Sequence, residues 1–429
     1  MECKRRTFVK GAGAVAAGAL IGTSSSWAGA NDRINIAVIG VHGRGNDHIK
    51  GHQAQENVEV AAICDPDKRV LAQRAEEFQK NYNKPVKTVV DMRDLFSDPA
   101  IDAVSIATPN HWHALATIWA CQAGKDVYVE KPGSHNIFEG RKMIEAAYKY
   151  RRIVQHGVQL RSSAALQEAV RLLREGVIGE PYLARGLCFR RRPSIGKKPP
   201  TWVPEHIDYN LWLGPAKWRP FSENVVHYNW HWHWDFGNGD VGNQGVHETD
   251  MCLWGLGVKS LPDKVVAMGG KFLWDDDKET PELLTTNFKF TPENKVVQFE
   301  TRPWNTNDEG GASVGNIFYG AKGYMVVRGY DEFATFLGDR REPGPKGREG
   351  GNHFANFHKA IRSRNMADQN GPVETIHYAS AIAHLGNIAY LTGRALDFDP
   401  RTERFVGDED ANRYLKRDYR PPFIVPEEV

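Results

Sequence analysis

Two polar clusters follow directly after short apolar runs, and both carry side chains that can do chemistry. The sequence TPNHWH at 108–113 follows the run 103–107, and EKP at 130–132 follows the run 127–129. Ligands of open parallel sheets bind beyond the carboxyl ends of the strands, where such clusters would lie. There, the ammonium group of Lys131 can stabilise an oxygen that gains negative charge as a hydride leaves its carbon. The alternative for a single lysine is a solvated surface charge.

A glycine-rich loop near the start of the chain is a further candidate site. The run 34–39 (INIAVI) is typical of a strand buried on both faces, and it leads directly into GVHGRG at 40–45. Such a loop lets the backbone approach a pyrophosphate at the N-terminus of the next helix, expected from residue 46. The usual G-x-G-x-x-G pattern would place glycines at 40, 42 and 45, whereas this chain has His42 in the middle and an additional Gly43.

Asp65 lies twenty residues after Gly45, at the end of a second apolar run, 58–64. An acid at this spacing accepts hydrogen bonds from the adenosine ribose hydroxyls of a dinucleotide. Its charge repels a 2′-phosphate, which favours NAD over NADP, although the nearby Lys68 and Arg69 weaken that preference. The alternative role for Asp65 is that of a helix N-cap or turn acid.

The elements that must position these residues alternate between strand and helix. The runs 34–39, 58–64, 103–107 and 127–129 are predicted strands, and 114–123 is a predicted helix that ends at Gly124. This pattern predicts a doubly wound parallel sheet. From about residue 181 the pattern changes to paired strands, for example around the turn 291–295, with helices expected at 164–175, 354–361 and 374–391.

The segment from 34 to about 156 resembles the Gfo/Idh/MocA family of oxidoreductases. The resemblance rests on the glycine loop and on AAICDP, IATPNHWHALAT, AGKDVYVEKP and the later GVIGEPYLARG. It implies an α/β Rossmann domain followed by an α/β domain with a large open, mostly antiparallel sheet. It also implies NAD(P), a sugar, glycoside or cyclitol substrate, and a homodimer or homotetramer formed through that sheet.

We therefore expect four segments. Residues 1–30 are a signal peptide, 31–156 the NAD-binding domain, 157–396 the substrate and oligomerisation domain, and 397–429 a tail that wraps the surface. The signal is of the twin-arginine type because KRRTFVK at 4–10 precedes a weakly apolar stretch and the small-x-small site at 28–30. This route exports folded proteins, so we expect a periplasmic protein that holds its nucleotide tightly.

The resemblance assigns acid–base chemistry to GNQGVHETD at 242–250. Many family members carry an Asp-x-x-x-His pair here, in which the histidine is the general acid/base and the aspartate assists it. His247 matches the histidine, but Asn243 stands where the aspartate is expected, and an amide cannot accept a proton or carry charge. Asp235 and Asp240 are candidates for the missing electrostatic role.

These arguments yield three sets of predicted site residues. The catalytic set is Lys131, Asn243 and His247. The cofactor-binding set is Gly40, His42, Gly43, Arg44, Gly45, Asp65, Thr108, Pro109, Asn110, His113, Glu130 and Lys131. The substrate-binding set is Lys131, Arg161, Trp234, Asp235, Asp240, Asn243 and His247.

The stretch 227–250 (HYNWHWHWDFGNGDVGNQGVHETD) is unusually rich in aromatic and histidine residues. Seven of the twelve tryptophans lie between 202 and 254, and their faces can stack on sugar rings or form a core wall. His231-x-His233 on a strand would point both rings one way and so could hold a metal. An aromatic wall explains the alternation more simply, so no metal is expected.

Composition excludes several other classes of function. The charge balance of 55 basic against 53 acidic residues gives no nucleic-acid footprint. Mean hydropathy is −0.52, and no apolar run reaches the ~18–20 residues of a membrane span. Five cysteines without a CxxC pair argue against disulfides or a zinc site.

Three hypotheses about function follow from the sequence. The first is an NAD-dependent sugar or polyol oxidoreductase. The second is redox-neutral cleavage of glycosides by oxidation, elimination and re-reduction on tightly held NAD. The third is a non-catalytic nucleotide or sugar sensor, suggested by Asn243 in place of aspartate.

Overall fold

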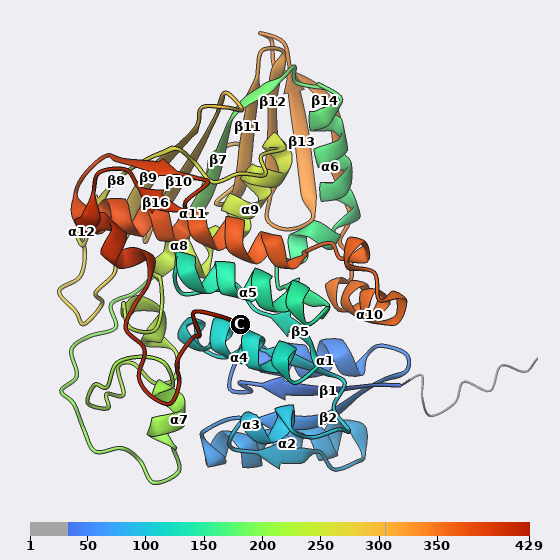
Figure 1. The fold of residues 1–429 in the computed structure, drawn as a ribbon. Coiled ribbons are helices and arrows are strands. Elements are labelled where there is room, and N and C mark those ends of the chain that lie inside the picture. The colour runs from blue at the N-terminus through green and yellow to red at the C-terminus, as the bar shows by residue number, and fades with distance from the viewer. Residues whose placement is uncertain (1–32, 305) are drawn as a thin grey trace, which may run out of the picture. The chain divides into compact units, whose positions relative to one another are not determined.

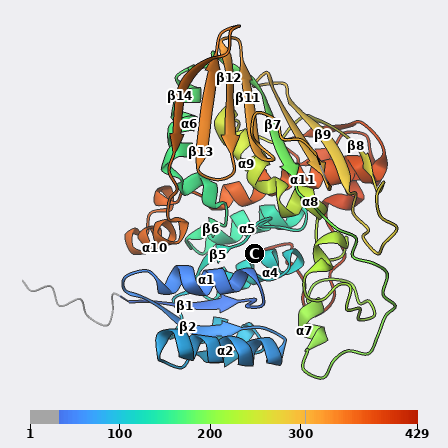
Figure 2. The same cartoon turned by 180° about the vertical axis from the view of Figure 1, so that it is seen from behind.

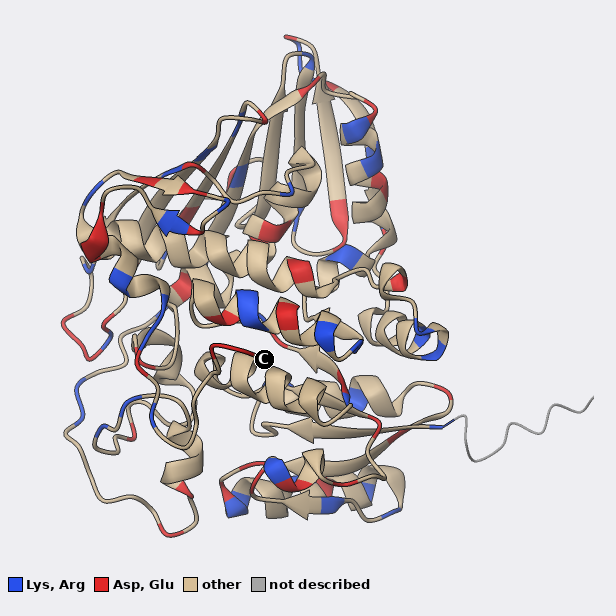
Figure 3. Cartoon of the chain, viewed as in Figure 1, with Lys and Arg blue, Asp and Glu red and all other residues tan. Residues whose placement is uncertain are grey.

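The computed structural model describes residues 33–304 and 306–429, so the predicted export signal at 1–30 lies outside the described residues. Residues 34–429 form one compact unit (Figure 1). None of the helices in the described ranges is both long and apolar enough to cross a bilayer. Lys and Arg are interspersed with Asp and Glu over the visible elements (Figure 3), as the net charge of +2 leads one to expect.

The N-terminal half is a six-stranded parallel sheet with the order β3-β2-β1-β4-β5-β6, which is the Rossmann order. This confirms the predicted doubly wound sheet. Its strands are β1 (Ile34–Ile39), β2 (Val58–Cys64), β3 (Lys87–Val89), β4 (Ala103–Ile106), β5 (Asp126–Val129) and β6 (Val154–His156). Its helices are α1 (Arg44–Gln53), α2 (Lys68–Tyr82), α3 (Arg93–Phe96), α4 (Asn110–Gln122) and α5 (Ile137–Lys149).

Each face of this sheet has its own apolar core. Residues of α3, α4 and α5 form one core. Residues of α1 and α2 form the other, together with α10 (His353–Ser363), which comes from the second half of the chain. The inner strands β1, β4 and β5 are apolar and largely buried on both faces because both faces of the sheet are covered. Their carboxyl ends, and the loops that follow them, are thereby fixed in place.

The second half is built on a ten-stranded sheet with the order β14-β13-β12-β11-β7-β10-β9-β8-β15-β16. Only the β7–β10 pair is parallel among its described pairings, which confirms a large, mostly antiparallel sheet. The strands are β7 (Pro181–Phe189), β8 (Lys264–Gly270), β9 (Leu283–Phe290), β10 (Lys295–Arg302), β11 (Val314–Gly320), β12 (Gly323–Arg328), β13 (Glu332–Leu337), β14 (Glu342–Arg348), β15 (Leu396–Asp399) and β16 (Arg404–Phe405).

Helices cover one face of this large sheet. They are α6 (Ala164–Arg174), α9 (Gly245–Leu256) and α11 (Val373–Thr392), and their buried residues share one core with the strands. The view from behind shows the strands of the other face without these helices in front of them (Figure 2). Helix α11 also packs against α5, which joins the two halves.

The sequence predicted that the C-terminal tail wraps the surface. In the structure the tail also contributes a strand and several buried side chains. Strand β15 extends the large sheet, and α12 (Glu409–Asn412) contributes Ala411 to its core. Phe423, Val425 and Val429 are buried in the core of the Rossmann half. These few apolar residues attach the otherwise polar tail to the molecule, because each packs against elements that are distant in sequence.

Candidate active site

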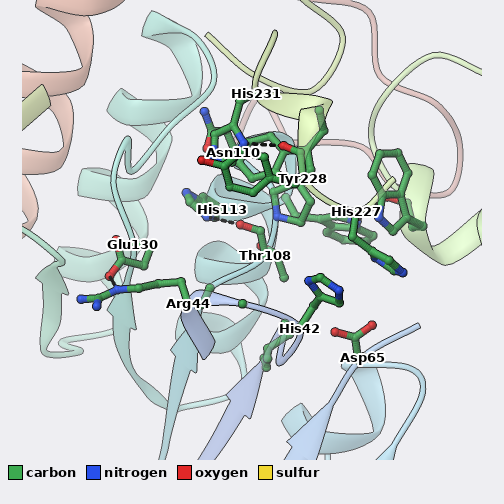
Figure 4. A pocket seen from close by; sticks show the side chains of 18 of the residues that line it. His42, Arg44, Asp65, Thr108, Asn110, His113, Glu130, His227, Tyr228 and His231 are labelled. Atoms are coloured by element: carbon green, nitrogen blue, oxygen red, sulfur yellow. Dashed lines mark hydrogen bonds and ion pairs between the residues drawn. The ribbon is translucent and has the colours of Figure 1, made fainter. Parts of the chain in front are cut away.

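One cavity of about 410 Å³ joins the carboxyl edge of the parallel sheet to α8 (Gly239–Asn243) and α9 (Figure 4). It brings together most of the predicted site residues. Those that line it are Gly40, His42, Gly43, Arg44, Asp65, Thr108, Pro109, Asn110, His113, Glu130, Lys131, Asn243 and His247.

The glycine loop has the geometry of a phosphate cradle. Gly40 has φ +82°, and a Cβ there would lie 2.7 Å from the Ala107 carbonyl oxygen. A Cβ on Gly45 would lie 1.9 Å from the carbonyl oxygen of Gly40, so both positions require glycine. Helix α1 begins at Arg44, two residues earlier than expected, and its N-cap residue Gly43 supplies no side-chain cap. The N–H groups of Arg44 and Gly45 are therefore left for an anion, which fits a dinucleotide pyrophosphate, whereas the Asn46 N–H bonds the Gly43 carbonyl at 2.9 Å.

Asp65 lies at the end of β2 and is 5% exposed. Its carboxylate accepts hydrogen bonds from the backbone N–H of Val41 at 2.9 Å and of Asp67 at 3.0 Å. Burial raises the pKa of Asp65, against the effect of these bonds. The two bonds orient the carboxylate in the cavity wall and leave acceptor capacity for a ribose hydroxyl. The N-cap role that was the alternative for Asp65 belongs to Asp67, whose side chain caps α2.

Lys131 reaches across the cavity to Asn243. Its ammonium group donates to the backbone carbonyl of Asn243 and, at 3.3 Å, to the side-chain oxygen Oδ1 of the same residue. Burial lowers the pKa of Lys131, and the charge of Glu130 opposes that shift. Asn243 thus fixes the lysine with neutral oxygens where the family pattern has a charged one.

His247 lies on the first turns of α9 and is 4% exposed. Burial first, and the charge of Lys131 second, lower the pKa of His247 to about 3. The imidazole is therefore neutral at pH 7 and can accept a proton. Its ring packs edge-on against Tyr330 with centroids 5.1 Å apart.

Glu248, the next residue on α9, is a buried carboxyl group 2% exposed. Burial raises the pKa of Glu248 to about 8. Its Oε1 accepts a hydrogen bond from Gln244 at 2.9 Å, and Gln244 also donates to the Tyr330 hydroxyl at 2.7 Å. Gln244 therefore links this neutral acid to a side chain that lines the cavity.

Arg44, at the end of the glycine loop, forms an ion pair with Glu130. The Arg44 Nε atom lies 2.8 Å from Glu130 Oε1. Gln159 donates to the same carboxylate oxygen at 3.2 Å. The negative charge beside Lys131 is therefore held by several donors.

Five predicted residues do not line this cavity. Gly45 is the close-packed glycine described above, and Arg161 makes a bidentate ion pair with Asp250 at 2.7 and 2.8 Å. Asp240 is held by Arg192 at 2.6–3.1 Å. Trp234 and Asp235 line a second cavity against α11 and the tail. The acids considered as replacements for the missing aspartate are thus placed elsewhere, Asp240 in an ion pair and Asp235 near Arg219.

The stretch around His231 is not a strand but a short 3-10 helix, η3 (Asn229–Trp232). The His231 ring stacks on Trp230 with centroids 3.6 Å apart, whereas His233 points to Glu279. No group of three or more potential metal ligands occurs in the part of the chain that the structure describes. The rings of His231 and His233 therefore have different neighbours and do not point to one common site.

Sequence reasoning missed a segment that covers the nucleotide end of the cavity. We call residues 205–236 the strap. It is bonded to the Rossmann half through Lys68 N–H to the His206 carbonyl and Asp208 N–H to the Pro66 carbonyl, both at 2.9 Å. It supplies six residues to the cavity wall, namely Leu211, Trp212, His227, Tyr228, Trp230 and His231. The tryptophan clustering was the one sequence signal that pointed to it.

His227 of the strap fastens this cover directly over the glycine loop. Its Nε2 lies 2.9 Å from the Asp67 carboxylate, and its ring stacks on His42 with centroids 4.5 Å apart. Tyr330, from the loop between β12 and β13, closes the opposite end beside His247. No local sequence pattern marks Tyr330.

A Rossmann sheet with a glycine cradle, an acid after β2 and a Lys–His pair at the carboxyl edge is the arrangement expected of an NAD-binding oxidoreductase family. Comparison with protein families agrees. Residues 34–158 match the oxidoreductase family model described as an NAD-binding Rossmann fold, and residues 193–268 and 327–425 match its C-terminal alpha/beta domain. The chain belongs to the Gfo/Idh/MocA family of oxidoreductases.

Among curated proteins, the chain is 29% identical over 201 residues to a glycosyl hydrolase family 109 protein of Shewanella sp. (strain W3-18-1). It is 30% identical over the same length to one of Shewanella baltica (strain OS185). Each match covers 41% of this chain and 44% of the relative. The chain therefore matches less than half the length of these relatives.

Solved structures share the fold at low identity. Levoglucosan dehydrogenase in complex with NADH and levoglucosan superposes with a TM-score of 0.66 at 19% identity, over 85% of this chain and 99% of that one. Aldose-aldose oxidoreductase from Caulobacter crescentus gives 0.66 at 16%, over 85% and 100%. The WlbA dehydrogenase from Bordetella pertussis, in complex with NADH and UDP-GlcNAcA, gives 0.64 at 17%, over 86% and 99%.

Proposed function

We propose that this protein is an NAD-dependent oxidoreductase that transfers a hydride to or from a sugar, glycoside or cyclitol. The observation that carries the proposal is the shared cavity. The glycine loop and Asp65 line the same cavity as Lys131, Asn243 and His247. The bound nicotinamide would supply the hydride acceptor or donor, and the residues of this chain would manage the proton and the charge.

The chain's own residues divide the work on a substrate hydroxyl. Neutral His247 accepts the hydroxyl proton as the carbon loses its hydride. The ammonium group of Lys131 stabilises the negative charge that develops on the oxygen. Asn243 holds Lys131 in place through two oxygens. Trp230, Tyr228 and Tyr330 offer aromatic faces to a sugar ring.

We further propose that NAD is preferred to NADP and is held tightly. The Asp65 carboxylate in the cavity wall supports the preference because it would repel a 2′-phosphate. The strap supports tight binding, since it is bonded to the loop after β2 and to α2. Mass spectrometry of the denatured protein should release NAD(H), and Asp65→Ala should lower the NAD/NADP affinity ratio. A protein that purifies without dinucleotide would refute tight binding.

The test of the oxidoreductase proposal is spectroscopic. Candidate sugars and glycosides are added to the purified protein while nicotinamide absorbance and fluorescence are followed. Reduced nicotinamide should form with at least one compound, and the His247→Ala protein should form it ~10²–10⁴ times more slowly. A spectrum that no sugar, glycoside or cyclitol changes would favour a non-catalytic sensor.

A second candidate function is redox-neutral cleavage of glycosides. It is favoured by the curated relatives named glycosyl hydrolase family 109 and by the strap, because a retained cofactor would be regenerated in each cycle. Product analysis separates the two functions. Net oxidation yields a ketone or lactone and NADH, whereas cleavage yields a free sugar and no net NADH.

We also propose export to the periplasm by the twin-arginine route, from the pattern at 4–10. Replacing Arg5 and Arg6 with Lys should leave unprocessed protein in the cytoplasm. Normal processing of that variant would show that the pattern is accidental.

Assembly into a homodimer or homotetramer is the remaining part of the proposal. Val266 and Met268 are exposed apolar side chains on β8, and Phe272 and Leu273 follow them. A second copy covering them would remove this apolar area from water. Light scattering of the purified protein should give at least twice the monomer mass.

A further inference from the structure

A chain of hydrogen bonds runs from the cavity through the interior of the Rossmann half to α10. Glu130 Oε1 lies 3.0 Å from His48 Nε2, and His48 Nδ1 lies 2.8 Å from the Ser105 hydroxyl. The same hydroxyl lies 2.8 Å from His52 Nε2, and His52 Nδ1 lies 2.9 Å from His358 Nε2. Four successive bonds thus join five side chains, of which only Glu130 lines the cavity.

The charge at Glu130 fixes the direction of the first bonds. Burial disfavours the carboxylate, but the charge of Arg44 and the hydrogen bond from His48 hold the pKa of Glu130 well below its usual value. A carboxylate only accepts, so His48 must donate from Nε2. Burial lowers the pKa of His48 despite Glu130, so the ring is neutral and its Nδ1 is an acceptor. The Ser105 hydroxyl therefore donates its single proton to His48.

The remaining bonds follow in the same direction. Ser105 Oγ has given its proton away, so it accepts from His52 Nε2–H. Neutral His52 then accepts at Nδ1 from His358 Nε2–H. This leaves the Nδ1 lone pair of His358 without a donor, and that atom is buried without a hydrogen-bond partner among the described residues. Every donor in the chain points toward Glu130.

The chain is enclosed by aromatic rings. His48, His52, Ser105 and His358 are each at most 1% exposed. Tyr128 and Phe354 pack edge-on against both His48 and His52, and Phe357 packs against His52. Such a lining keeps water from breaking the sequence of bonds, so protons can move along it only through the side chains themselves.

We propose that Glu130, His48, Ser105, His52 and His358 form a proton relay that delivers a proton to the active-site cavity during carbonyl reduction. This inference rests on the proposed function. A proton that reaches the buried His358 Nδ1, at the α10 end of the chain of hydrogen bonds, releases the Nε2 proton of His358 to His52 Nδ1. His52 passes its Nε2 proton to Ser105, Ser105 to His48 Nδ1, and His48 its Nε2 proton to Glu130. Each step breaks one N–H or O–H bond and forms another, and no electrons are transferred.

The relay supplies what hydride transfer to a carbonyl consumes. Reduction of C=O to CH–OH takes up one hydride from the reduced nicotinamide and one proton. With the strap bonded over the nucleotide end, a route through the Rossmann interior can supply that proton without opening the cavity. Glu130 then holds the proton on the cavity wall beside Lys131 and replaces the proton that His247 donates to the substrate oxygen in reduction.

The first test needs no substrate. Nitrogen-15 NMR of histidine-labelled protein at pH 7 reports which ring nitrogen carries hydrogen, and single His→Gln variants assign the signals. We expect His48, His52 and His358 all to be neutral with hydrogen on Nε2. A single ring with hydrogen on Nδ1 instead would break the sequence of donors and overturn the relay.

The second test interrupts the relay at its centre. Ser105→Ala should lower kcat for carbonyl reduction by roughly 10²-fold, with KM for the carbonyl substrate and NAD content unchanged. Ser105→Thr restores a hydroxyl and should recover most of the turnover. Thr117→Val is the matched control, because it removes a buried Rossmann hydroxyl that has no hydrogen-bond partner among the described residues.

The outcomes separate the relay from the proposed function. Turnover of Ser105→Ala equal to that of Thr117→Val would overturn the relay and leave the oxidoreductase proposal intact. A merely structural role for Ser105 would instead lower NAD content or raise KM together with the loss of kcat. If the parent reduces no carbonyl compound, the proposed function fails, and the NMR result alone decides the relay.

Discussion

At the scale of single residues, burial decides what the candidate catalytic groups can do. His247 is neutral because its cavity position and the nearby Lys131 both oppose a second positive charge. Lys131 is held by two oxygens of one asparagine rather than by a carboxylate. His247 is therefore neutral at pH 7 before any substrate binds.

Replacing His247 tests the assignment of the base. We expect His247→Ala to lose ~10²–10⁴ in kcat and to retain bound NAD, because His247 lies on α9 rather than in the glycine loop. Steady-state kinetics and mass spectrometry of released nucleotide measure the two effects. His233→Ala, which removes a buried histidine outside this cavity, is the control. Equal turnover of the two variants would remove His247 from the mechanism.

Replacing Asn243 tests the neutral partner of Lys131. Asn243→Asp places a negative charge near the ammonium group, at the position where Oδ1 now lies 3.3 Å away. That charge should raise the pKa of Lys131, which burial now lowers. We expect activity to be kept within about tenfold and the alkaline limb of kcat/KM to move to higher pH. An unchanged alkaline limb would mean that Lys131 does not titrate there.

At the scale of elements, the strap covers one end of the cavity and supplies six residues to its wall. It begins in the substrate half of the chain, crosses to the loop after β2 and the start of α2, and returns to α8. Two of its bonds to the Rossmann half join backbone groups, whereas the side chains of His206 and His227 both contact the Asp67 carboxylate. Because His227 contacts Asp67 and stacks on His42, its replacement is the change expected to loosen the strap most directly.

We expect His227→Ala to release NAD at least several-fold faster than the parent protein. The variant loses the contact with Asp67 and the stacking on His42 but leaves the N-cap of α2 intact. The protein with NADH bound is mixed with excess NAD, and stopped-flow fluorescence follows the release rate of the NADH. Trp218→Ala, a 69% exposed position on the same strap, should release NAD at the parental rate. Equal rates for the two variants would show that the strap does not retain the nucleotide.

At the scale of the whole molecule, buried neutral histidines make stability depend on pH. Burial lowers the pKa of several of them to about 3, namely His111, His231, His247, His358 and His384. In the unfolded chain these groups take up protons near pH 6.5. The unfolded state therefore binds more protons between pH 6.5 and 3, so stability falls as the pH falls through this window.

We expect Tm to be nearly constant from pH 8 to 7 and to fall steadily from pH 6.5 toward pH 4. Each such histidine contributes up to ~1.4 kcal/mol per pH unit to the slope. His384→Gln should be destabilised at pH 8 but should lose less stability than the parent between pH 8 and 5. Thermal unfolding at both pH values measures this, and parallel curves for the two proteins would contradict it.

The sequence by itself determined the parallel sheet, its glycine loop and the place of Asp65. These features are local: a run of apolar residues, a turn that tolerates only glycine, and an acid at fixed spacing. It also indicated Lys131 and His247, because their motifs follow predicted elements directly. The antiparallel pairs around the turn 291–295 were visible for the same reason, since alternation along one strand marks one buried face.

Only the tertiary structure decided which of the remaining polar residues meet. Asp240 and Arg192 are 48 residues apart and Arg161 and Asp250 are 89 apart, yet each pair is joined by ion-pair contacts. Tyr330 lies in the cavity wall beside His247, and His358 bonds to His52, although both residues are distant in sequence from these partners. No sequence window contains these partners. Whether a carboxylate is free for substrate or already paired depends on distances in space, which packing of the two halves sets.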